Sequence, residues 1–458
     1  MTTRVILVRH GQSSYNVERR VQGHCDESTL TEAGQKTARQ VGEALRGLPF
    51  DAMYSSPLQR AKDTAELIRA CLLAEHVPEL QFTDNLKEIN LVTWEGVLFS
   101  EVEATDPEGF QAWQRRPHEL KMMVSNPDGT VTEYYPVPAL YEQATQLWQD
   151  ILPRHIGQTI LLVAHSGINR ALIGTAIGLT PADYQNVHQS NCGISVLNFP
   201  DDWSLADRNR SPVQVESTNQ TAHLGKPLPE IRNHHRGPRF LLVRHGETDW
   251  NRDKRFQGQI DVPLNDRGRE QSQLAAEFLQ AIQMDFAFSS PMLRPKETAE
   301  IILQFHPGVR LELEDNLQEI SHGHWEGKLE EEIRQEYPGI LEQWQEAPAT
   351  VQMPEGENLQ DVWQRAIVGW QTILKSVWAR AGDRPVTVLV VAHDAVNKAL
   401  LCHLLNLGPE HFWNFKQGNG AVTVIDYPLG PEERAVLQAV NITSHQGSVL
   451  DRTAAGAL

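Results

Sequence analysis

The sequence predicts an α/β protein with two tandem three-layer domains, each built on a largely parallel sheet flanked by helices. Short apolar runs alternate with segments of helical periodicity, a pattern typical of strand–helix–strand units. The same series of motifs occurs twice along the 458 residues. The length also suits two domains of roughly 200 residues, each large enough for its own core.

The internal repeat extends over most of the chain, so we expect a duplicated domain rather than a solenoid with a short period. We expect the first domain at 1–225, a Pro- and Gly-rich linker at 226–238 and the second domain at 239–450. The pair His234-His235 lies in this linker and is expected to be solvated. The matching segments are RVILVRHGQSSYN (4–16) with RFLLVRHGETDWN (239–251), YSSPLQRAKDTAEL (54–67) with FSSPMLRPKETAEI (288–301), and LLVAHSGINRALI (161–173) with LVVAHDAVNKALL (389–401).

In the first half, strands and helices are expected to alternate. Val5–Val8 is predicted as a strand buried on both faces, because four apolar residues follow one another. Thr31 is a suitable N-cap for a helix that runs to about Leu45, and Asn265 is its counterpart before Asp266 in the second half. The other expected elements are strands at Asp51–Ser55, Leu80–Thr83 and Thr159–Ala164, and helices at Leu58–Leu73, Ala139–Leu152 and Ile168–Ile177.

The tripeptide Arg-His-Gly follows the first buried strand in each half. Ligands of open α/β sheets bind beyond the carboxyl ends of the strands, where Arg244 and His245 are expected, and likewise Arg9 and His10. An arginine beside a nucleophilic imidazole suits a phosphate ester, because the guanidinium binds two oxygens while a ring nitrogen faces phosphorus. One such motif is weak evidence, but its repetition favours a catalytic site.

Further polar residues follow other strands in both halves. In each half an arginine, Arg60 or Arg294, lies in the first turn of an expected helix, where the helix dipole favours anions. Two arginines and a second, protonated histidine can stabilise a phosphoryl group without a metal, and flanking cations should lower the pKa of the nucleophilic histidine. A glutamate can protonate the leaving group and then activate water. The candidate catalytic residues are His245, Glu319, His393, Arg244 and Arg294 in the second half and His10, Glu88, His165, Arg9 and Arg60 in the first, with Glu326 as the next candidate for the acid.

Composition limits the partners. A formal net charge of −18 argues against nucleic acid or an anionic membrane surface, but a local arginine cluster can still bind a small phosphorylated metabolite. The four cysteines show no CxxC spacing, which favours unpaired thiols in a reducing compartment. No apolar run approaches the length of a membrane span, and the first strand is expected within a few residues of Met1, so a cytoplasmic location is expected. No metal and no cofactor are expected, and the sequence does not determine an oligomeric state.

The segments VRHGETDWN, SSPMLRPKETAE, NLQEISHGHWEG and VVAHDAVNKALL resemble the histidine phosphatase superfamily, whose fold is phosphoglycerate-mutase-like. The resemblance covers nearly all of both halves. It implies that His245 and His10 become phosphorylated, that the arginines and second histidines bind phosphate, and that Glu319 and Glu88 are the acids. The expected substrate-binding residues are Asn251, Gln257 and Gly258 in the second half and Asn16, Gln22 and Gly23 in the first.

The spacing after the acid resembles the phosphatase branch, because the long insertion of cofactor-dependent mutases, with its YGxLxGLNK-like and RRS segments, is missing. The tandem arrangement is similar to plant-type carboxyarabinitol 1-phosphate phosphatases and their cyanobacterial relatives. The predicted function is therefore a metal-independent phosphatase for a small phosphorylated sugar or organic acid, a carboxyarabinitol-type sugar phosphate included. Phosphoglycerate mutase-type phosphoryl transfer, or a phosphate-binding regulatory protein with one inactive domain, is the alternative.

The two halves differ beside the expected pocket. Residues 354–358, Pro-Glu-Gly-Glu-Asn, resemble the family's P-G-G-E-S turn, whereas the first half has Tyr-Tyr-Pro-Val-Pro at 134–138. Positioning dominates phosphoryl transfer. We therefore expect the second half to carry most of the turnover.

Overall fold

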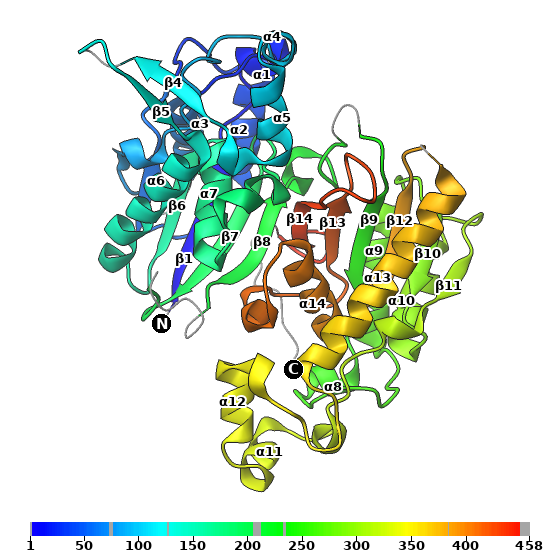
Figure 1. Cartoon of the computed structure of the whole chain (residues 1–458). Helices are drawn as coiled ribbons and strands as arrows, with labels where there is room; N and C mark the ends of the chain where they lie inside the picture. Colours follow the sequence, from blue (N-terminus) through cyan, green and yellow to red (C-terminus); the bar gives the residue numbers. More distant parts are fainter. Residues whose placement is uncertain are drawn as a thin grey trace. The chain divides into compact units, whose positions relative to one another are not determined.

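The computed structural model describes residues 2–72, 77–125, 128–204, 212–231, 235–382 and 384–448, which form two compact α/β units (Figure 1). Within these ranges the first unit holds residues up to 204 and 218–226, and the second holds 212–217 and everything from 227 onward. His234 and the expected domain end at 450 lie outside the described residues.

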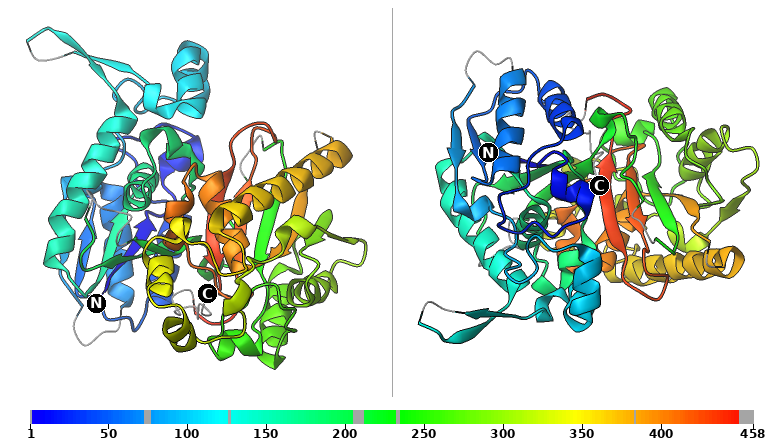
Figure 2. Two further views of the ribbon diagram at one scale, coloured as in Figure 1. Left: turned by 60° about the horizontal axis from the view of Figure 1, so that its bottom comes forward. Right: turned by 90° about the horizontal axis from the view of Figure 1, so that it is seen from above.

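The first unit contains a mixed, mostly parallel sheet in the order β7-β1-β6-β2-β3. β1, β6, β2 and β3 run parallel, and β7 pairs with β1 in the antiparallel sense. A separate antiparallel hairpin, β4-β5, extends away from this sheet (Figure 2). The strands are β1 (Thr2–Arg9), β2 (Ala52–Ser55), β3 (Leu80–Phe82), β4 (Met122–Ser125), β5 (Val131–Tyr134), β6 (Thr159–Ala164) and β7 (Ile194–Pro200); the helices are α1 (Ser14–Glu18), α2 (Glu32–Ala44), α3 (Gln59–Cys71), α4 (Phe99–Thr105), α5 (Pro107–Arg115), α6 (Pro136–Ile151) and α7 (Ser166–Ile177); β8 (Gln214–Gln220) contains the division between the units, after Ser217.

The second unit repeats this topology in the order β11-β10-β12-β9-β13-β14. β9, β12, β10 and β11 are parallel, and β13 is antiparallel to both β9 and β14. The strands are β9 (Arg239–Arg244), β10 (Phe286–Ser289), β11 (Leu311–Leu313), β12 (Thr387–Ala392), β13 (Val422–Asp426) and β14 (Val436–Ile442); the helices are α8 (Asp249–Arg252), α9 (Asp266–Leu279), α10 (Leu293–Leu303), α11 (Glu330–Glu336), α12 (Ile340–Glu346), α13 (Leu359–Ala381) and α14 (Asp394–Leu404).

The three layers follow from the alternation of side chains along a buried strand. On β9, Leu241 and Val243 point into a core that Ala276 and Leu279 of α9 and Ala299 of α10 complete. On the opposite face, Phe240 packs against Trp370 of α13, with ring centroids 4.6 Å apart. Helices therefore cover both faces of the sheet (Figure 1), which confirms the predicted α/β class.

The predicted helix caps are confirmed. Thr31 accepts a hydrogen bond from the backbone N–H of Gly34, and Asn265 accepts one from Gly268. The helix expected at Ala139–Leu152 begins earlier, at Pro136, because proline lacks only an N–H that the first turn leaves unpaired. The strand predicted at Val5–Val8 begins three residues earlier, at Thr2, and the other predicted elements agree with the structure to within two residues.

The segment expected to be a solvated linker belongs largely to the second unit. Leu228 is buried in the core with Leu241 and Val243, and Arg239 donates a hydrogen bond from Nη1 to the Pro229 carbonyl at 2.7 Å. His235 is also buried, so the expectation that it is solvated is wrong. Leu228 is an apolar residue among polar ones. The free energy gained by burying it outweighs the loop-like composition of the segment.

The turn after the first strand depends on a close approach of two backbones. A Cβ atom at Gly246 would overlap with the carbonyl oxygen of Gly268, in the first turn of α9. The same relation holds between Gly11 and Gly34 in the first unit. The turn that carries the histidine is thereby packed directly on the helix that follows.

We expect Gly246→Ala to lower the free energy of unfolding by about 1–3 kcal/mol, because the added methyl group must displace buried backbone. Urea unfolding measured by circular dichroism checks this value. Gly308→Ala is the matched control, since a Cβ at Gly308 meets nothing within 4 Å. Equal stability of the two variants would contradict the close approach.

Candidate active site

The carboxyl ends of neighbouring parallel strands place the predicted residues of the second unit together. Arg244 ends β9 and pairs in register with Ala392 of β12, so His245 and His393 leave the sheet side by side. Their ring centroids lie 5.2 Å apart. Arg294 is the second residue of α10, which begins just after the neighbouring strand β10.

The hydrogen bonds of His245 determine its tautomer. Nδ1 lies 2.7 Å from the Gly246 carbonyl, which can only accept, so Nδ1 carries the proton. Nε2 then holds a lone pair, and it accepts a hydrogen bond from Nε of Arg294 at 3.3 Å. Burial, Arg294 and Arg244 together lower the pKa of His245 well below its usual range. The ring is therefore neutral, with its unprotonated nitrogen beside a guanidinium, as a nucleophile toward phosphorus requires.

Arg294 is fully buried, and its guanidinium donates hydrogen bonds to backbone carbonyls. Nη2 donates to Gly258 at 2.8 Å and Nη1 donates to Ile260 at 3.3 Å. One turn along α10, the hydroxyl of Thr298 donates to the Arg294 carbonyl and accepts from the N–H of Gly246, which couples the helix start to the histidine turn. Burial lowers the pKa of Arg294 to about 10, so the side chain stays charged at neutral pH.

The second histidine differs from the prediction. His393 is fully buried, and its Nε2 lies 2.9 Å from the hydroxyl of Ser290. Burial, followed by Arg294 and His245, lowers its pKa well below the usual range. The expectation of a protonated second histidine is thus wrong, because a charge on this buried ring would lie beside the Arg294 cation. Ser290 was missed as a partner, although the SSP motif recurs in both halves.

Glu319 is buried at the edge of this group. Oε1 accepts from the N–H of Ile320 at 3.0 Å and Oε2 from that of Ala395 at 3.4 Å. Burial is the largest cause that raises the pKa of Glu319, and Asp394 adds to it, while Arg294 opposes. A carboxyl whose neutral form is favoured in this way is suited to donate a proton.

The turn at 354–358 acts on Glu319 through the backbone. Arg365 of α13 donates from Nη2 to the Glu319 carbonyl at 2.8 Å and forms an ion pair with Glu357 at 2.7 Å. Glu357 in turn accepts from the N–H of Ser321 at 2.8 Å. The Glu-containing turn therefore clamps the loop that carries the acid, a role that no local sequence signal had indicated for Arg365.

The first unit brings its predicted histidines and arginines together in a similar arrangement, but Nε of Arg60 has no hydrogen-bond partner among the described residues. The rings of His10 and His165 have centroids 5.1 Å apart, Nδ1 of His10 donates to the Gly11 carbonyl at 2.7 Å, and Nε2 of His165 lies 2.8 Å from Ser56. Arg60 donates from Nη2 to the Gly23 carbonyl at 2.9 Å. Burial and nearby arginines lower the pKa values of both histidines well below their usual range, and burial lowers that of Arg9 to about 10.

The acid of the first unit has different surroundings. Glu88 is only half-buried, and its carboxylate accepts N–H bonds from Ile89, Gly167 and Ile168 at 2.9–3.1 Å. Gln143 takes the place of Arg365, donating to two carbonyls of the preceding loop but reaching no carboxylate. Glu88 is thus more exposed than Glu319, and it is held by three backbone N–H groups without an Arg365-type clamp behind its loop.

The predicted substrate-binding residues form a bracing network beside each histidine. Thr248 donates to Oε1 of Gln257 at 2.8 Å, and its N–H donates to Oδ1 of Asn251 at 3.2 Å. The carbonyl of Gly258 is used by Arg294. In the first unit Ser13 takes the role of Thr248 toward Asn16 and Gln22, and Gly23 takes that of Gly258.

Glu326, the alternative acid, is engaged elsewhere. Its carboxylate accepts N–H bonds from Gln259 and Ile260 at 2.8–2.9 Å and from His322 at 3.1 Å. It therefore shapes the loop whose carbonyls hold Arg294. Glu95 has the corresponding contact in the first unit, with the N–H of His24 at 2.7 Å.

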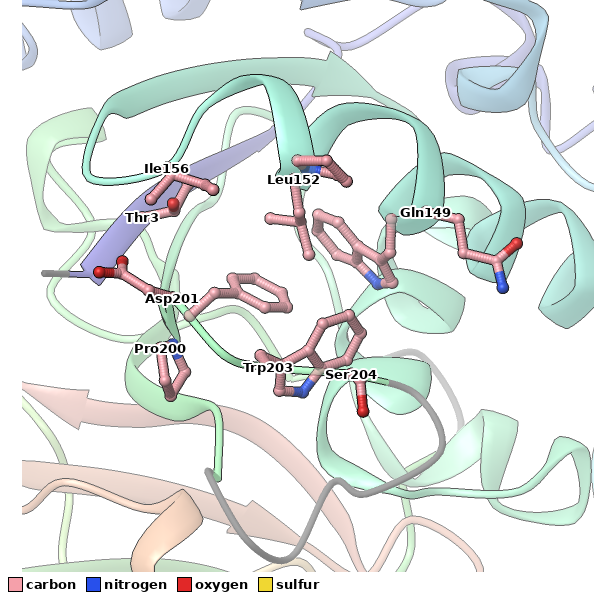
Figure 3. Close-up of a pocket in the computed structure, with 11 residues that line it drawn as sticks. Thr3, Gln149, Leu152, Ile156, Pro200, Asp201, Trp203 and Ser204 are labelled. Atoms are coloured by element: carbon pink, nitrogen blue, oxygen red, sulfur yellow. The ribbon is translucent and has the colours of Figure 1, made fainter.

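A pocket of about 480 Å³ in the first unit lies away from this site (Figure 3). Its walls include Trp148, Phe199 and Trp203, and Thr3 near the amino end of β1. Because His10 follows the carboxyl end of β1, the pocket and His10 lie at opposite ends of this strand. None of the candidate catalytic residues lines it.

Two further observations concern metal ligands and membrane-spanning helices. In the described part of the chain, no group of three or more His, Cys, Asp or Glu side chains is arranged to hold a metal ion. Within the same ranges, none of the helices combines the length and apolar character that crossing a membrane requires. Arginines place positive charge near each histidine pair.

The histidine-centred site, present twice, agrees with comparisons to known proteins. The family model described as histidine phosphatase superfamily (branch 1) matches residues 5–209 and again 240–443. The chain belongs to the histidine phosphatase superfamily.

Three curated relatives with phosphatase names match the chain. A 2-carboxy-D-arabinitol-1-phosphatase of Triticum aestivum is 29% identical over 97% of this chain and 86% of the relative, and a probable 2-carboxy-D-arabinitol-1-phosphatase of Arabidopsis thaliana is 30% identical over 97% and 88%. Phosphoserine phosphatase 1 of Hydrogenobacter thermophilus is 36% identical over 46% of this chain and 94% of its own length. The protein is a phosphatase acting on phosphomonoesters.

Burial of neutral histidines makes stability depend on pH. His10, His165, His245 and His393 have pKa values lowered in the folded state, so below about pH 6.5 the unfolded chain binds more protons. We expect the free energy of unfolding to fall as the pH drops from 6.5 toward 5, by up to about 1.4 kcal/mol per pH unit for each histidine. Urea titrations at several pH values measure this slope.

The matched variant is His245→Gln/His393→Gln, which should show a shallower slope over the same range. Glu319, with its raised pKa, acts in the opposite sense, because the folded state then holds a proton that the unfolded state has released. A stability that does not change between pH 7 and 5 would contradict the neutral, buried state of the histidines.

Proposed function

We propose that this protein hydrolyses a small phosphorylated sugar or organic acid through a phosphohistidine intermediate, without a metal or cofactor. The observation that carries the proposal is the geometry of His245: a neutral ring whose unprotonated Nε2 is held beside the Arg294 guanidinium. The first unit repeats the neutral histidine pair and the buried arginine.

In the first step, Nε2 of His245 attacks phosphorus and the ester P–O bond breaks. Arg244 and Arg294 neutralise the phosphoryl oxygens, and Ser290 orients His393 toward them. Glu319 gives its proton to the leaving alkoxide, which departs as an alcohol. In the second step, water attacks the phosphohistidine, the Glu319 carboxylate takes the water proton, and the N–P bond breaks to release phosphate.

We propose that both units are catalytic domains, with His10, Glu88, His165, Arg9 and Arg60 in the corresponding roles. The first site lacks the Glu357–Arg365 clamp and holds Glu88 by N–H donors. It therefore suits esters with good leaving groups, whereas the second site suits alkyl esters. Asn251, Gln257 and Gly258, with Asn16, Gln22 and Gly23, are proposed to border the phosphate.

The names of the wheat and Arabidopsis relatives, which match along almost the whole chain, favour a carboxyarabinitol-type sugar phosphate as substrate. A probable phosphoglycerate mutase also matches half of the chain, at 31% identity, so mutase-type transfer remains the second candidate. Four cysteines that form no disulfide support the proposal of a cytoplasmic location.

Rapid-quench labelling with a ³²P-labelled alkyl phosphate tests the intermediate. We expect an acid-labile, base-stable adduct on the native chain, reduced by most of its amount in His245→Ala and retained in His10→Ala, because the second site has the better acid. An acid-stable adduct would exclude histidine as nucleophile. A larger loss in folded His10→Ala would assign the main turnover to the first unit.

The acid is tested by Glu319→Gln in a His10→Ala chain, where the second site acts alone. Release of alcohol in the first turnover should slow about 10²–10⁴-fold for an alkyl ester and far less for p-nitrophenyl phosphate, whose leaving group needs no proton. Glu326→Gln is the control and should show no such contrast. Equal losses for both esters would remove Glu319 from the acid role.

A further inference from the structure

The two sites differ at the residue that follows the second histidine. The second unit has Asp394 there, at the first position of α14, and the first unit has Ser166 at the first position of α7. Asp394 is 3% exposed. It lies between two cations, with Oδ1 3.4 Å from Nη1 of Arg244 and Oδ2 2.7 Å from Nζ of Lys398.

We propose that Asp394 is a positioning residue of the second site, which fixes the Arg244 guanidinium and places a negative charge beside Glu319. This inference rests on the acid role proposed for Glu319. It adds a buried carboxylate, with its partner Lys398, to the Glu357–Arg365 clamp as a difference between the two sites.

The first part of the role concerns Arg244. This guanidinium donates from Nη1 to the carbonyl of Gln417 and is paired by the same nitrogen with Asp394, so its plane is set from the protein side. The remaining N–H groups are left for a ligand. In the first unit the corresponding Arg9 donates to the carbonyl of Gln189, and Ser166 offers it no charge.

The second part concerns the protonation of Glu319. The charged side chains that act on it are Arg294 from α10, Arg244 from β9, and Asp394 and Lys398 from α14, while Arg365 from α13 holds its carbonyl. After burial, Asp394 is the largest influence that raises the pKa of Glu319, and the two arginines lower it. Without Asp394, the charged side chains that act on Glu319 would all be cations. They would stabilise the ionised form of Glu319 and lower its pKa.

Lys398 completes the arrangement by neutralising Asp394. It is buried, and its ammonium lies over the rings of Phe412 and Trp413, 5.1 and 4.8 Å from their centroids. In the first unit Arg170 takes this position, donates to Gln185 at 2.9 Å and lies over the ring of Tyr184. Both units thus have a cation at this position, Arg170 in the first and Lys398 in the second. The second unit pairs its cation with Asp394, whereas the first unit has Ser166 in place of Asp394.

The test uses the full chain with His10→Ala, so that the second site alone is observed. The variants are Asp394→Asn and Asp394→Asn/Lys398→Met; the double variant leaves no unpaired buried charge and keeps the fold testable. The control is Asp426→Asn, which breaks the buried pair of Asp426 with Arg239, 2.7 Å apart, at the far end of β9. The measurement is kcat for glycerol phosphate as a function of pH.

The basic limb of kcat reports the acid in the enzyme–substrate complex. We expect this limb to move down by about one pH unit in both Asp394 variants, and alkyl-ester turnover above the limb to fall about tenfold. Asp426→Asn should lose stability but keep the limb in place. A uniform loss at every pH, or a shift in the single variant that the double variant abolishes, would overturn the assignment.

Glu319→Gln separates this inference from the proposed function. If that variant removes the basic limb while the Asp394 variants leave it unmoved, the acid role stands and the positioning role fails. If the limb persists in Glu319→Gln, the proposed acid itself is wrong.

Discussion

The second site is organised around one constraint, the burial of the Arg294 guanidinium. A cation removed from water costs several kcal/mol unless its donors are satisfied and an anion is close. Two donors bind the carbonyls of Gly258 and Ile260, and the third binds the ring of His245. The loop at 258–260 must therefore keep its conformation. The Glu326 carboxylate supports that conformation by accepting hydrogen bonds from two N–H groups of the loop.

This constraint also explains the state of the histidines. Burial, together with the nearby Arg294 guanidinium, favours the neutral form of both His245 and His393. A phosphate dianion entering such a site meets fixed positive charge and an unprotonated nitrogen. In the proposed mechanism, the field that attracts phosphate is also the one that keeps His245 unprotonated.

The duplicated units keep the histidines and vary the carboxylates. The ring separations of 5.1 and 5.2 Å agree closely, because both pairs leave adjacent parallel strands in the same register. The acids are held by loops, which strand register does not constrain. Glu88 is half-buried and accepts three backbone N–H groups, whereas Glu319 is buried near Asp394, so the two carboxylates have different surroundings.

The sequence by itself determined the duplicated α/β fold, the helix caps, and the histidines, arginines and glutamates of both sites. These depend on local patterns: buried apolar runs, caps within one turn, and motifs that recur in both halves. Only the tertiary structure decided the tautomer of His245, the neutral state of His393, the clamp of Arg365 on Glu319 and the burial of Leu228. Each of these depends on hydrogen bonds or burial between residues distant in the chain, and no local pattern records the charge, or the absence of water, that such neighbours impose.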